Sequence, residues 1–363
     1  MPEFYAGLMS GTSLDGVDSV LADLSTSTPR LLGHCHHAFE PALKAELASL
    51  NHPGADELRR AARASNELSR VYSAAIGALL TQCSLGPTTV SAIGCHGQTV
   101  RHQPGDGYTL QLVNGSLLAE LTRINVVCDF RSRDIAAGGE GAPLVPAFHH
   151  AVFTSPVAHR VIVNIGGIAN LTDLPRAGAV TGFDCGPGNL LLDAWTQRHL
   201  AQPFDRNGAW ALGGSMIPAL LARLRAAEYF RRTPPKSTGR ETFNLEWLDQ
   251  LLDGTEKPDD VQATLLALTA HEISNAIGSF CTDATEVYLC GGGARNTALT
   301  RLITTLLAPR QVAATDTLGV SAEHVEALAF AWLAQQTLNS RTGNLPAVTG
   351  ARGARILGAI YRA

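Results

Sequence analysis

Three glycine-dense turns, each following a short apolar run, constrain the fold of this 363-residue chain more than any other feature. They lie at Gly7–Asp18, Asn164–Asn170 and Cys290–Asn296. The first two patterns predict hairpins, and the third predicts a strand followed by a helix that begins near Asn296. Such turns expose backbone N–H groups that suit phosphate oxygens. Because one glycine turn alone is most often only a turn, the hypothesis of a nucleotide cradle depends on all three together.

A single aspartate, Asp184, stands between the second glycine turn and another glycine-rich loop, Gly186–Asn189. The pattern predicts that a strand ends at this aspartate and that a helix follows from about Leu190 to Leu200. A carboxylate at such a junction is well placed for proton transfer. The alternative is that it caps the turn by accepting hydrogen bonds from nearby amides. The residues alone leave both roles open.

Composition limits the class of protein. With 45% hydrophobic and 17% charged residues, the chain can bury substantial cores, and its length favours two domains. The formal net charge of -4, without a dense basic block, argues against a nucleic-acid partner. No segment approaches the roughly 18 consecutive apolar residues of a membrane span, and the N-terminal sequence lacks a signal-peptide pattern. We therefore expect a cytoplasmic protein without a membrane partner.

The cysteines and histidines do not predict a metal site. Seven cysteines are scattered without a Cys-x-x-Cys pair, which indicates free thiols in a reducing compartment. The run His34-Cys35-His36-His37 is tempting, but adjacent residues of a strand point to opposite faces and cannot converge on one ion. The pair His149-His150 meets the same objection.

Hydrophobic periodicity places the remaining elements. It predicts helices over Ala55–Thr81, Gly115–Thr122, Pro218–Tyr229, Val261–Phe280 and Ser321–Asn339. It also predicts strands at Tyr108–Leu112, at Ile124–Cys128, in EVYLCGG, and in VSAIGCHGQTV, where a buried strand ends in a polar loop. The charged, glycine-rich segment Asp129–Pro146 is expected to be a loop that crosses between lobes and acts as a hinge. The excursion YFRRTPPKSTGRETFN is expected to be a lid or a loop beside the substrate.

The first turn has its own chemistry. Its residues supply hydroxyls, amides and two carboxylates within one hairpin: Gly11, Thr12, Ser13, Leu14, Asp15, Gly16, Val17 and Asp18. They suit a loop that holds terminal phosphates while Asp15 or Asp18 orients hydrated Mg²⁺, which needs only one or two carboxylates. The alternative for Asp15-Gly16 is an ordinary hairpin turn. None of the turns matches the Gly-x4-Gly-Lys-Ser/Thr phosphate loop or the Gly-x-Gly-x-x-Gly dinucleotide motif. The remaining large class holds ATP between two similar lobes.

Long motifs along nearly the whole chain closely resemble one family. They are GLMSGTSLDGVD, GCHGQTV, DFRSRDIAAGGEGAPLVPAFHH, NIGGIANL, FDCGPGNLLLDAW, KSTGRETFN, CGGGARN and VEALAFAWLA. The family is that of anhydro-N-acetylmuramic acid kinases, within the superfamily of actin-like ATPases, sugar kinases and heat-shock ATPases. The resemblance implies a two-lobed α/β fold, actin-like and ribonuclease H-like, with ATP and substrate in the interlobe cleft. We expect one lobe to comprise 1–135 plus 345–363, and the other 136–344.

The resemblance also implies an activity. A member of this family uses ATP and Mg²⁺ to phosphorylate 1,6-anhydro-N-acetylmuramic acid while water opens the anhydro bridge. The products are N-acetylmuramic acid 6-phosphate and ADP, and the setting is cell-wall recycling. A homodimer is expected from the same resemblance. Two alternatives stay open: another sugar or carboxylate kinase of the superfamily, and a non-catalytic actin-like ATPase.

The resemblance assigns roles to residues of this sequence. Asp184 is the general base, and Gly11–Asp18 is the first phosphate loop. The second phosphate loop is expected to comprise Asn164, Gly166, Gly167 and Asn170. The loop beside adenosine is expected to comprise Gly291, Gly292, Gly293 and Arg295. Candidates for recognising the sugar or its lactyl carboxylate are His96, Gln98, Arg131 and Glu326.

The chemistry of four positions bears on these assignments. Arg131 suits a bidentate grip on a carboxylate. For His96 the alternative is a core histidine, and for Glu326 a solvated position on a helix. Cys185 stands where the family commonly has Thr, so any hydrogen bond that this Thr makes is in doubt here.

Overall fold

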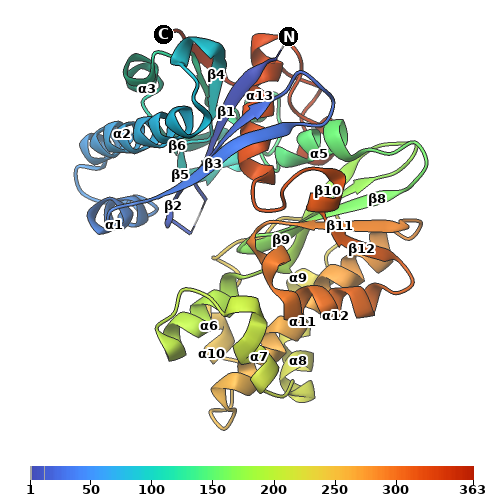
Figure 1. Ribbon diagram of the computed structural model, residues 1–363. Coiled ribbons are helices and arrows are strands. Elements are labelled where there is room, and N and C mark those ends of the chain that lie inside the picture. The colour runs from blue at the N-terminus through green and yellow to red at the C-terminus, as the bar shows by residue number, and fades with distance from the viewer. Residues whose placement is uncertain (1, 12) are drawn as a thin grey trace. The chain divides into compact units, whose positions relative to one another are not determined.

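A computed structural model describes residues 2–11 and 13–363 of the chain (Figure 1). The chain forms two compact units. Unit 1 comprises the residues up to Val152 together with His324–Ala363, and unit 2 comprises Phe153–Glu323. These boundaries differ from the expected ones, because residues 136–152 and 324–344 belong to unit 1.

Unit 1 is built on a mixed sheet in which six described strands have the order β13-β7-β4-β1-β2-β3. The strands β1 (Phe4–Met9), β2 (Gly16–Asp23) and β3 (Arg30–Ala38) form an antiparallel meander. The strand β4 (Val90–Cys95) runs parallel to β1, and β7 (Val126–Cys128) runs parallel to β4. The last strand, β13 (Ala359–Tyr361), pairs antiparallel with β7. The predicted N-terminal hairpin is confirmed as β1 and β2.

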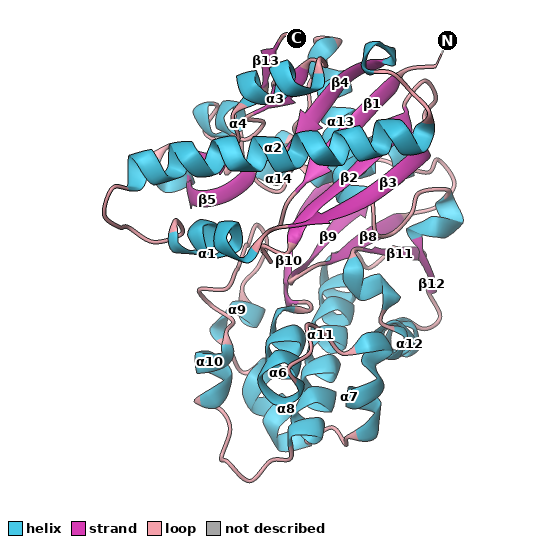
Figure 2. Ribbon diagram, turned by 60° about the vertical axis from the view of Figure 1, so that its left-hand side comes forward, coloured by secondary structure: helices cyan, strands magenta, loops and turns pink. Residues whose placement is uncertain are grey.

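Helices cover both faces of this sheet, as Figure 2 shows for the long α2 (Glu57–Cys83). Ala6 and Leu8 of β1 pack in one cluster with the buried side chains of α2. Between them, Gly7 faces α13 (Val325–Leu338), and a Cβ there would overlap the carbonyl oxygen of Ala327. Side chains alternate along a strand, so the two helices lie on opposite faces. The close approach of α13 explains why this helix belongs to unit 1.

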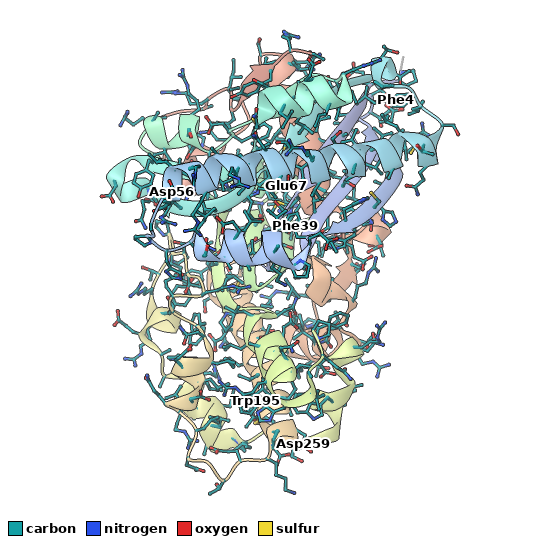
Figure 3. The ribbon with its side chains drawn as sticks, turned by 90° about the vertical axis from the view of Figure 1, so that its left-hand side faces the viewer. Phe4, Phe39, Asp56, Glu67, Trp195 and Asp259 are labelled. Atoms are coloured by element: carbon teal, nitrogen blue, oxygen red, sulfur yellow. The ribbon has the colours of Figure 1, made fainter. Side chains whose placement is uncertain are left out.

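Smaller elements complete unit 1. They are the helices α1 (Pro41–Ser49), α3 (Gly115–Thr122), α4 (Ser132–Ala136), α5 (Val145–Phe153) and α14 (Pro346–Thr349), and the two-stranded sheet of β5 (Gln98–Gln103) and β6 (Tyr108–Leu112). Phe39, just before α1, is buried in the same cluster as the inner face of α2 (Figure 3).

Unit 2 repeats the sheet topology of unit 1. Among its described residues, β8 (Arg160–Ile165), β9 (Ile168–Leu174) and β10 (Thr181–Pro187) form an antiparallel meander. The strands β11 (Glu286–Cys290) and β12 (Gln311–Ala314) then extend the sheet in parallel with β8. The order β10-β9-β8-β11-β12 corresponds to β3-β2-β1-β4-β7 in unit 1. The predicted two-lobed α/β fold of the actin-like class is confirmed.

A helical layer packs on the sheet of unit 2. It consists of α6 (Leu190–Leu200), α7 (Ala209–Gly213), α8 (Pro218–Arg225), α9 (Glu228–Arg231), α10 (Leu245–Asp249), α11 (Pro258–Phe280) and α12 (Thr297–Leu307). Trp195 of α6 is buried within this layer (Figure 3) and donates its indole N–H to the carbonyl of Pro258. The predicted helices at Leu190, Pro218 and Val261 are present, although α8 ends at Arg225.

The expectation for Asp129–Pro146 is wrong in part. The segment stays within unit 1, contains α4, and leads into α5, which begins at Val145. The cause is Asp134, which is fully buried. Its carboxylate accepts hydrogen bonds from Asn344 Nδ2, Thr349 Oγ1 and Gly141 N at 2.6, 2.8 and 2.8 Å. The strands β3, β5, β12 and β13 were also not expected.

None of the helices in the described part of the chain has the length and apolar character needed to cross a membrane.

Candidate active site

The second of the three glycine turns, which lies in unit 2, holds the start of α6. Gly166 and Gly167 connect β8 to β9, and their carbonyls accept hydrogen bonds from the backbone N–H groups of Asn189, at 2.8 Å, and Gly188, at 2.9 Å. A Cβ on Gly188 would overlap the carbonyl oxygen of Gly166. The two glycine-rich loops therefore interlock through their backbones, which only a residue without a side chain allows at Gly188.

The third glycine turn lies against the second. Cys290, the last residue of β11, pairs with Asn164 of β8 in the parallel ladder. Gly291 follows with a φ of 79° in the left-handed region, and a Cβ there would overlap Asn164 Oδ1. Asn164 also pairs across the hairpin with Asn170. The predicted residues of the second and third turns thus meet at one edge of the sheet, where the parallel strands end.

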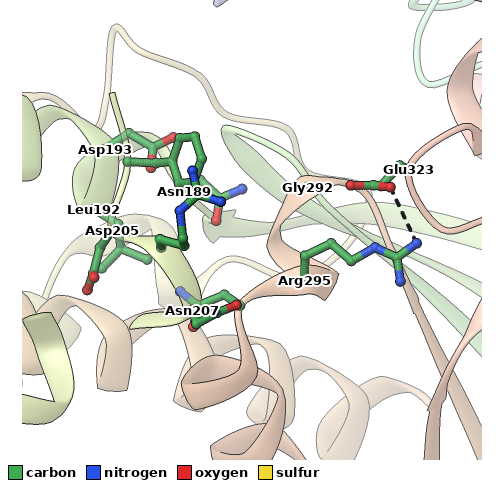
Figure 4. Close-up of a pocket in the computed structure, with 11 residues that line it drawn as sticks. Asn189, Leu192, Asp193, Asp205, Asn207, Gly292, Arg295 and Glu323 are labelled. Carbon is green, nitrogen blue, oxygen red and sulfur yellow. Dashed lines mark hydrogen bonds and ion pairs between the residues drawn. The ribbon is translucent and has the colours of Figure 1, made fainter. Parts of the chain in front are cut away.

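Beside these turns, unit 2 contains a pocket of about 370 Å³, which Figure 4 shows in close-up. Its size is within the usual range for a small-molecule site. Gly292 and Arg295, both predicted to lie by adenosine, line it. Arg295 is held by ion pairs to Asp316, at 3.1 Å, and Glu323, at 3.4 Å. Glu323 lines the pocket as well, and the other lining residues are Asn189, Leu192, Asp193, Phe204, Asp205, Arg206, Asn207 and Asn296.

The sequence did not identify most of these lining residues. Asn189 carried a signal, because it belongs to the Gly186–Asn189 loop. The segment from Phe204 to Asn207 carried none, since it is distant in sequence from every glycine turn and reaches the pocket only through the packing of unit 2.

Asp184 lies on β10, where the pairing with β9 becomes irregular between Asp184 and Gly186. Its carboxylate Oδ2 accepts a hydrogen bond from the backbone N–H of Thr238 at 3.0 Å. Its own backbone N–H donates to the carbonyl of Lys236 at 3.2 Å, and its carbonyl accepts from the Tyr229 hydroxyl at 2.7 Å. Both the main chain and the carboxylate of this residue are therefore fixed from outside its strand.

The electrostatic environment raises the pKa of Asp184 from 3.8 to about 6. Burial is the main cause, and the negative charge of Glu241 acts in the same direction. The Thr238 N–H and the positive charge of Lys236 oppose the rise. A carboxylate with a pKa near 6 is ionised at neutral pH and accepts a proton more readily than an ordinary aspartate. The site can therefore support general-base chemistry.

The side chain of the neighbouring Cys185 lies in the core of unit 2. Its thiol is buried in the core of unit 2, and burial raises its pKa well above the usual range. The Cys185 side chain therefore makes a core contact.

The excursion before α10 reaches Asp184 through Lys236–Thr238. Lys236 Nζ lies 4.8 Å from the centre of the Tyr229 ring, and burial lowers its pKa. A few residues further on, Phe243 is fully buried and packs on Tyr229 with ring centres 5.7 Å apart. This anchoring folds the excursion onto the carboxylate of Asp184, and its role as a lid or a loop beside the substrate stays a prediction.

In unit 1, three of the four predicted sugar contacts form one cluster. Arg131 donates from Nη2 and Nε to His96 Nε2 at 2.9 and 3.2 Å, and from Nη1 to the carbonyl of Gly141 at 2.8 Å. The His96 Nδ1 lies 3.3 Å from the carbonyl oxygen of Ser10. Glu326, at the start of α13, supplies the nearby negative charge that supports the ionised form of Arg131.

Burial sets the charge states in this cluster. It lowers the pKa of His96 to about 3, and the neighbouring Arg131 charge adds to the effect. His96 is therefore neutral, with Nδ1 as the donor and Nε2 as the acceptor. Burial also lowers the pKa of Arg131, to about 10, which still leaves the guanidinium charged at neutral pH. The Nε–Nη2 edge of Arg131 is engaged by His96, so a carboxylate would have to meet its remaining N–H groups.

Gln98 joins this cluster to the first glycine turn. Its Nε2 donates to the carbonyl of Gly11 at 3.1 Å, while its buried Oε1 finds no hydrogen-bond partner among the described residues. A buried acceptor without a partner costs about 1–3 kcal/mol, which a bound ligand with a donor group would recover. Gln98 is thus suited to the ligand contact that the sequence suggested.

Within the first turn, side chains differ in what they can offer. The Asp15 carboxylate is exposed and accepts a hydrogen bond from Ser13 Oγ at 2.6 Å. The Asp18 carboxylate pairs with His36 Nδ1 at 2.8 Å on the neighbouring strand. Leu14 and Val17 are buried in the core of unit 1, so only their backbone atoms are available to a nucleotide. Gly16 packs closely on β3, and Thr12 lies outside the described residues.

A magnesium ion held mainly by water and phosphate fits this turn. No group of three or more His, Cys, Asp or Glu side chains within residues 2–11 and 13–363 is arranged to hold a metal. Mg²⁺ that keeps several waters needs no such group, and the exposed Asp15 carboxylate is the better placed of the two candidates.

Duplicated sheets of one topology, with glycine turns at the strand ends, define the actin-like class of α/β proteins. The family model of anhydro-N-acetylmuramic acid kinase matches residues 3–363. A protein of that name from Nitrosospira multiformis is 55% identical over 362 residues, covering 99% of both chains. One from Nitrosomonas europaea is 54% identical over 362 residues, covering 99% of this chain and 100% of its own. The chain belongs to the anhydro-N-acetylmuramic acid kinase family.

One solved structure resembles this chain distantly. The activator of 2-hydroxyisocaproyl-CoA dehydratase from Clostridium difficile, with bound ADPNP, aligns with 94% of this chain and 96% of its own. The TM-score is 0.48 and the sequence identity is 12%.

Proposed function

We propose that this protein transfers the γ-phosphoryl group of ATP to O6 of 1,6-anhydro-N-acetylmuramic acid while water opens the anhydro bridge. The products would be N-acetylmuramic acid 6-phosphate and ADP, in the recycling of cell-wall fragments. The observation that carries the proposal is Asp184, a partly buried carboxylate whose backbone and side chain are both held by the Lys236–Thr238 segment and whose pKa is raised to about 6, in a chain of this family.

In the proposed reaction, Asp184 removes a proton from water as the water oxygen bonds to the anomeric carbon. The bond between that carbon and O6 breaks, and O6 forms a bond to the γ-phosphorus as the bond to ADP breaks. The proton stays on Asp184 until product release returns it to solvent. No covalent enzyme intermediate is needed, so catalysis depends on positioning and on charge stabilisation.

The remaining groups would bind and orient. The N–H groups of the glycine turns, Gly11–Asp18 and Asn164–Asn170, suit the phosphates, and the pocket lined by Gly292 and Arg295 suits adenosine. Mg²⁺, oriented by Asp15, would neutralise charge on the phosphates. In unit 1, Arg131 would meet the lactyl carboxylate, while His96, Gln98 and Glu326 would contact the sugar. The family resemblance also supports a cytoplasmic location and a homodimer. Analytical ultracentrifugation would test the homodimer.

Oxygen-18 labelling tests the reaction directly. The protein is incubated with Mg²⁺, ATP and the anhydro-sugar in H₂¹⁸O, and the product is analysed by mass spectrometry. We expect a 6-phosphate with one label at the anomeric carbon, formed by the wild type and lost in Asp184→Asn. The control Asp249→Asn removes an exposed carboxylate that pairs with Arg198 at 2.5 Å, and it should leave the product unchanged.

The alternatives give other outcomes. Phosphorylation without the label would identify a sugar kinase that lacks the hydrolytic half of the reaction. ATP hydrolysis whose rate does not change when the anhydro-sugar is added would identify an actin-like ATPase that does not act on sugars.

A further inference from the structure

The loop that covers Asp184 contains a hydroxyl that the described contacts leave unsatisfied. Thr238 Oγ1 is buried and finds no hydrogen-bond partner among residues 2–11 and 13–363. A buried hydroxyl without a partner is unfavourable, and most buried polar groups in native proteins are paired with protein or with ordered water. Such an atom beside an activated carboxylate therefore calls for a functional explanation.

The position of this hydroxyl relative to Asp184 is constrained by the backbone. The N–H of Thr238 donates to Asp184 Oδ2 across 3.0 Å. Covalent geometry keeps the Oγ1 of a threonine about 3 Å from its own backbone nitrogen in the two gauche χ1 rotamers and just under about 4 Å away in the trans rotamer. Oγ1 therefore lies at most about 7 Å from Oδ2 of Asp184. One water that makes two hydrogen bonds of about 2.8 Å spans up to about 5.6 Å, so it can bridge the two oxygens over most of that range.

The loop is held firmly enough to keep this arrangement. On one side, the carbonyl of Lys236 accepts the backbone N–H of Asp184. On the other side, the Gly239 carbonyl accepts the N–H of Phe243 at 3.1 Å, and the Phe243 ring is fully buried. Thr238 sits between these two anchors. Neither anchor involves the Thr238 hydroxyl. This hydroxyl therefore has no structural role of its own and is available to a ligand.

From this geometry we propose that Thr238 is a catalytic residue whose hydroxyl binds the water that Asp184 deprotonates. This inference rests on the proposed function. Thr238 Oγ1 donates its hydrogen to one lone pair of the water oxygen. One O–H of the water points to the Asp184 carboxylate, and the second lone pair of the water attacks the anomeric carbon. The proton passes to Asp184, the bond from the anomeric carbon to O6 breaks, and O6 takes the phosphoryl group from ATP.

The backbone and the side chain of Thr238 therefore have separable roles. The N–H occupies Oδ2 and leaves Oδ1 of Asp184 to act as the base. The hydroxyl orients the water. Replacing the side chain deletes the second role and keeps the first, because every residue except proline retains the N–H.

Two substitutions at Thr238 and one control test the proposal. Thr238→Val has nearly the same shape without the hydroxyl, and Thr238→Ser keeps the hydroxyl. Ser274→Ala is the matched control, because Ser274 Oγ on α11 is another buried hydroxyl without a partner among the described residues. For each protein we would measure kcat, the KM values for sugar and ATP, the pH profile, and unfolding in urea.

We expect kcat of Thr238→Val to fall about tenfold or more, with the KM for ATP unchanged. Its resistance to urea should equal or exceed that of the wild type, because an unsatisfied buried hydroxyl has been removed. The acid limb of its pH profile should stay in place, since the N–H to Asp184 remains. Thr238→Ser should recover most of kcat. Ser274→Ala should keep the wild-type kcat and, by the same reasoning, resist urea at least as well as the wild type.

Other results would overturn the proposal. Wild-type kcat in Thr238→Val, with labelled product from the wild type, would refute the role of Thr238 and leave the proposed function intact. A fall in kcat matched by a fall in urea resistance, or a displaced acid limb, would show a structural role instead. No labelled product from the wild type would refute the proposed function itself.

Discussion

Replacing Asp184 with asparagine should make the protein more stable while it abolishes the reaction. The folded protein raises the pKa of this carboxyl from 3.8 to about 6, mainly through burial. The folded state therefore binds the proton more tightly than the unfolded chain. It follows that the stability contributed by this group is fully present below pH 3.8 and is lost as the pH rises through about 6.

The magnitude follows from the two pKa values. The difference between 3.8 and about 6 corresponds to at most about 3 kcal/mol of unfolding free energy at pH 7.5. Asparagine stays neutral at every pH and still offers an oxygen to the Thr238 N–H. The variant should therefore be more stable than the wild type by up to about 3 kcal/mol at pH 7.5, and by about 1 kcal/mol at pH 4.5. For a unit of the size of Phe153–Glu323, each kcal/mol raises the melting temperature by about 2–4 °C.

The measurement is urea unfolding and calorimetry of both proteins at pH 7.5 and pH 4.5. Asp249→Asn, which removes an exposed carboxylate in an ion pair with Arg198, is the control and should not gain stability at pH 7.5. A variant of Asp184 that is no more stable than the wild type at pH 7.5 would refute the reasoning. So would a gain of the same size at both pH values, because a burial cost of a charged group must shrink when the carboxyl is protonated.

Three further predictions follow from the site. Because Asp184 must be ionised, kcat/KM for the sugar should fall about tenfold per pH unit below about pH 6, and a flat profile from pH 7 to 5 would exclude Asp184 as the base. Arg131→Lys loses the planar guanidinium group, so steady-state kinetics should show an increase of about tenfold or more in the KM for the sugar, with little change in the KM for ATP. Equal changes in the two KM values would argue against a contact between Arg131 and the sugar. Gly188→Ala places a Cβ on the carbonyl oxygen of Gly166, so thermal melting should show a loss of about 1–3 kcal/mol of unfolding free energy, and the KM for ATP should rise. The control is Gly77→Ala on α2, where a Cβ meets no atom within 4 Å, and this variant should be as stable as the wild type or more stable.

Local sequence predicted the framework of the site well, and the reason is that a hairpin turn is a local structure. Gly166 and Gly167 have to connect two short strands, whatever surrounds them, and β8 and β9 are found where the pattern placed them. The aspartate between glycine loops was identified in the same way. The resemblance of long motifs to one family supplied the activity, and the family comparison agrees with it.

The partners of these residues were harder to predict, because they come from distant parts of the chain. Thr238 is 54 residues from Asp184, and the family motif KSTGRETFN that contains it does not show that its N–H and hydroxyl lie beside that carboxylate. Likewise, Arg131 and His96 are 35 residues apart, and the sequence did not indicate that one ring nitrogen would accept from the guanidinium. Burial decides their pKa values, and burial is a property of the packed unit.

By itself, the sequence determined the glycine turns, the strands and helices beside them, the candidate base and the family, since each depends on residue type and short spacing. The tertiary structure decided how those parts act. It placed the third glycine turn against the second, turned Cys185 into the core, and folded the Lys236–Thr238 segment onto Asp184. A pKa near 6 requires that carboxylate to be removed from water, and only a packed chain can do that.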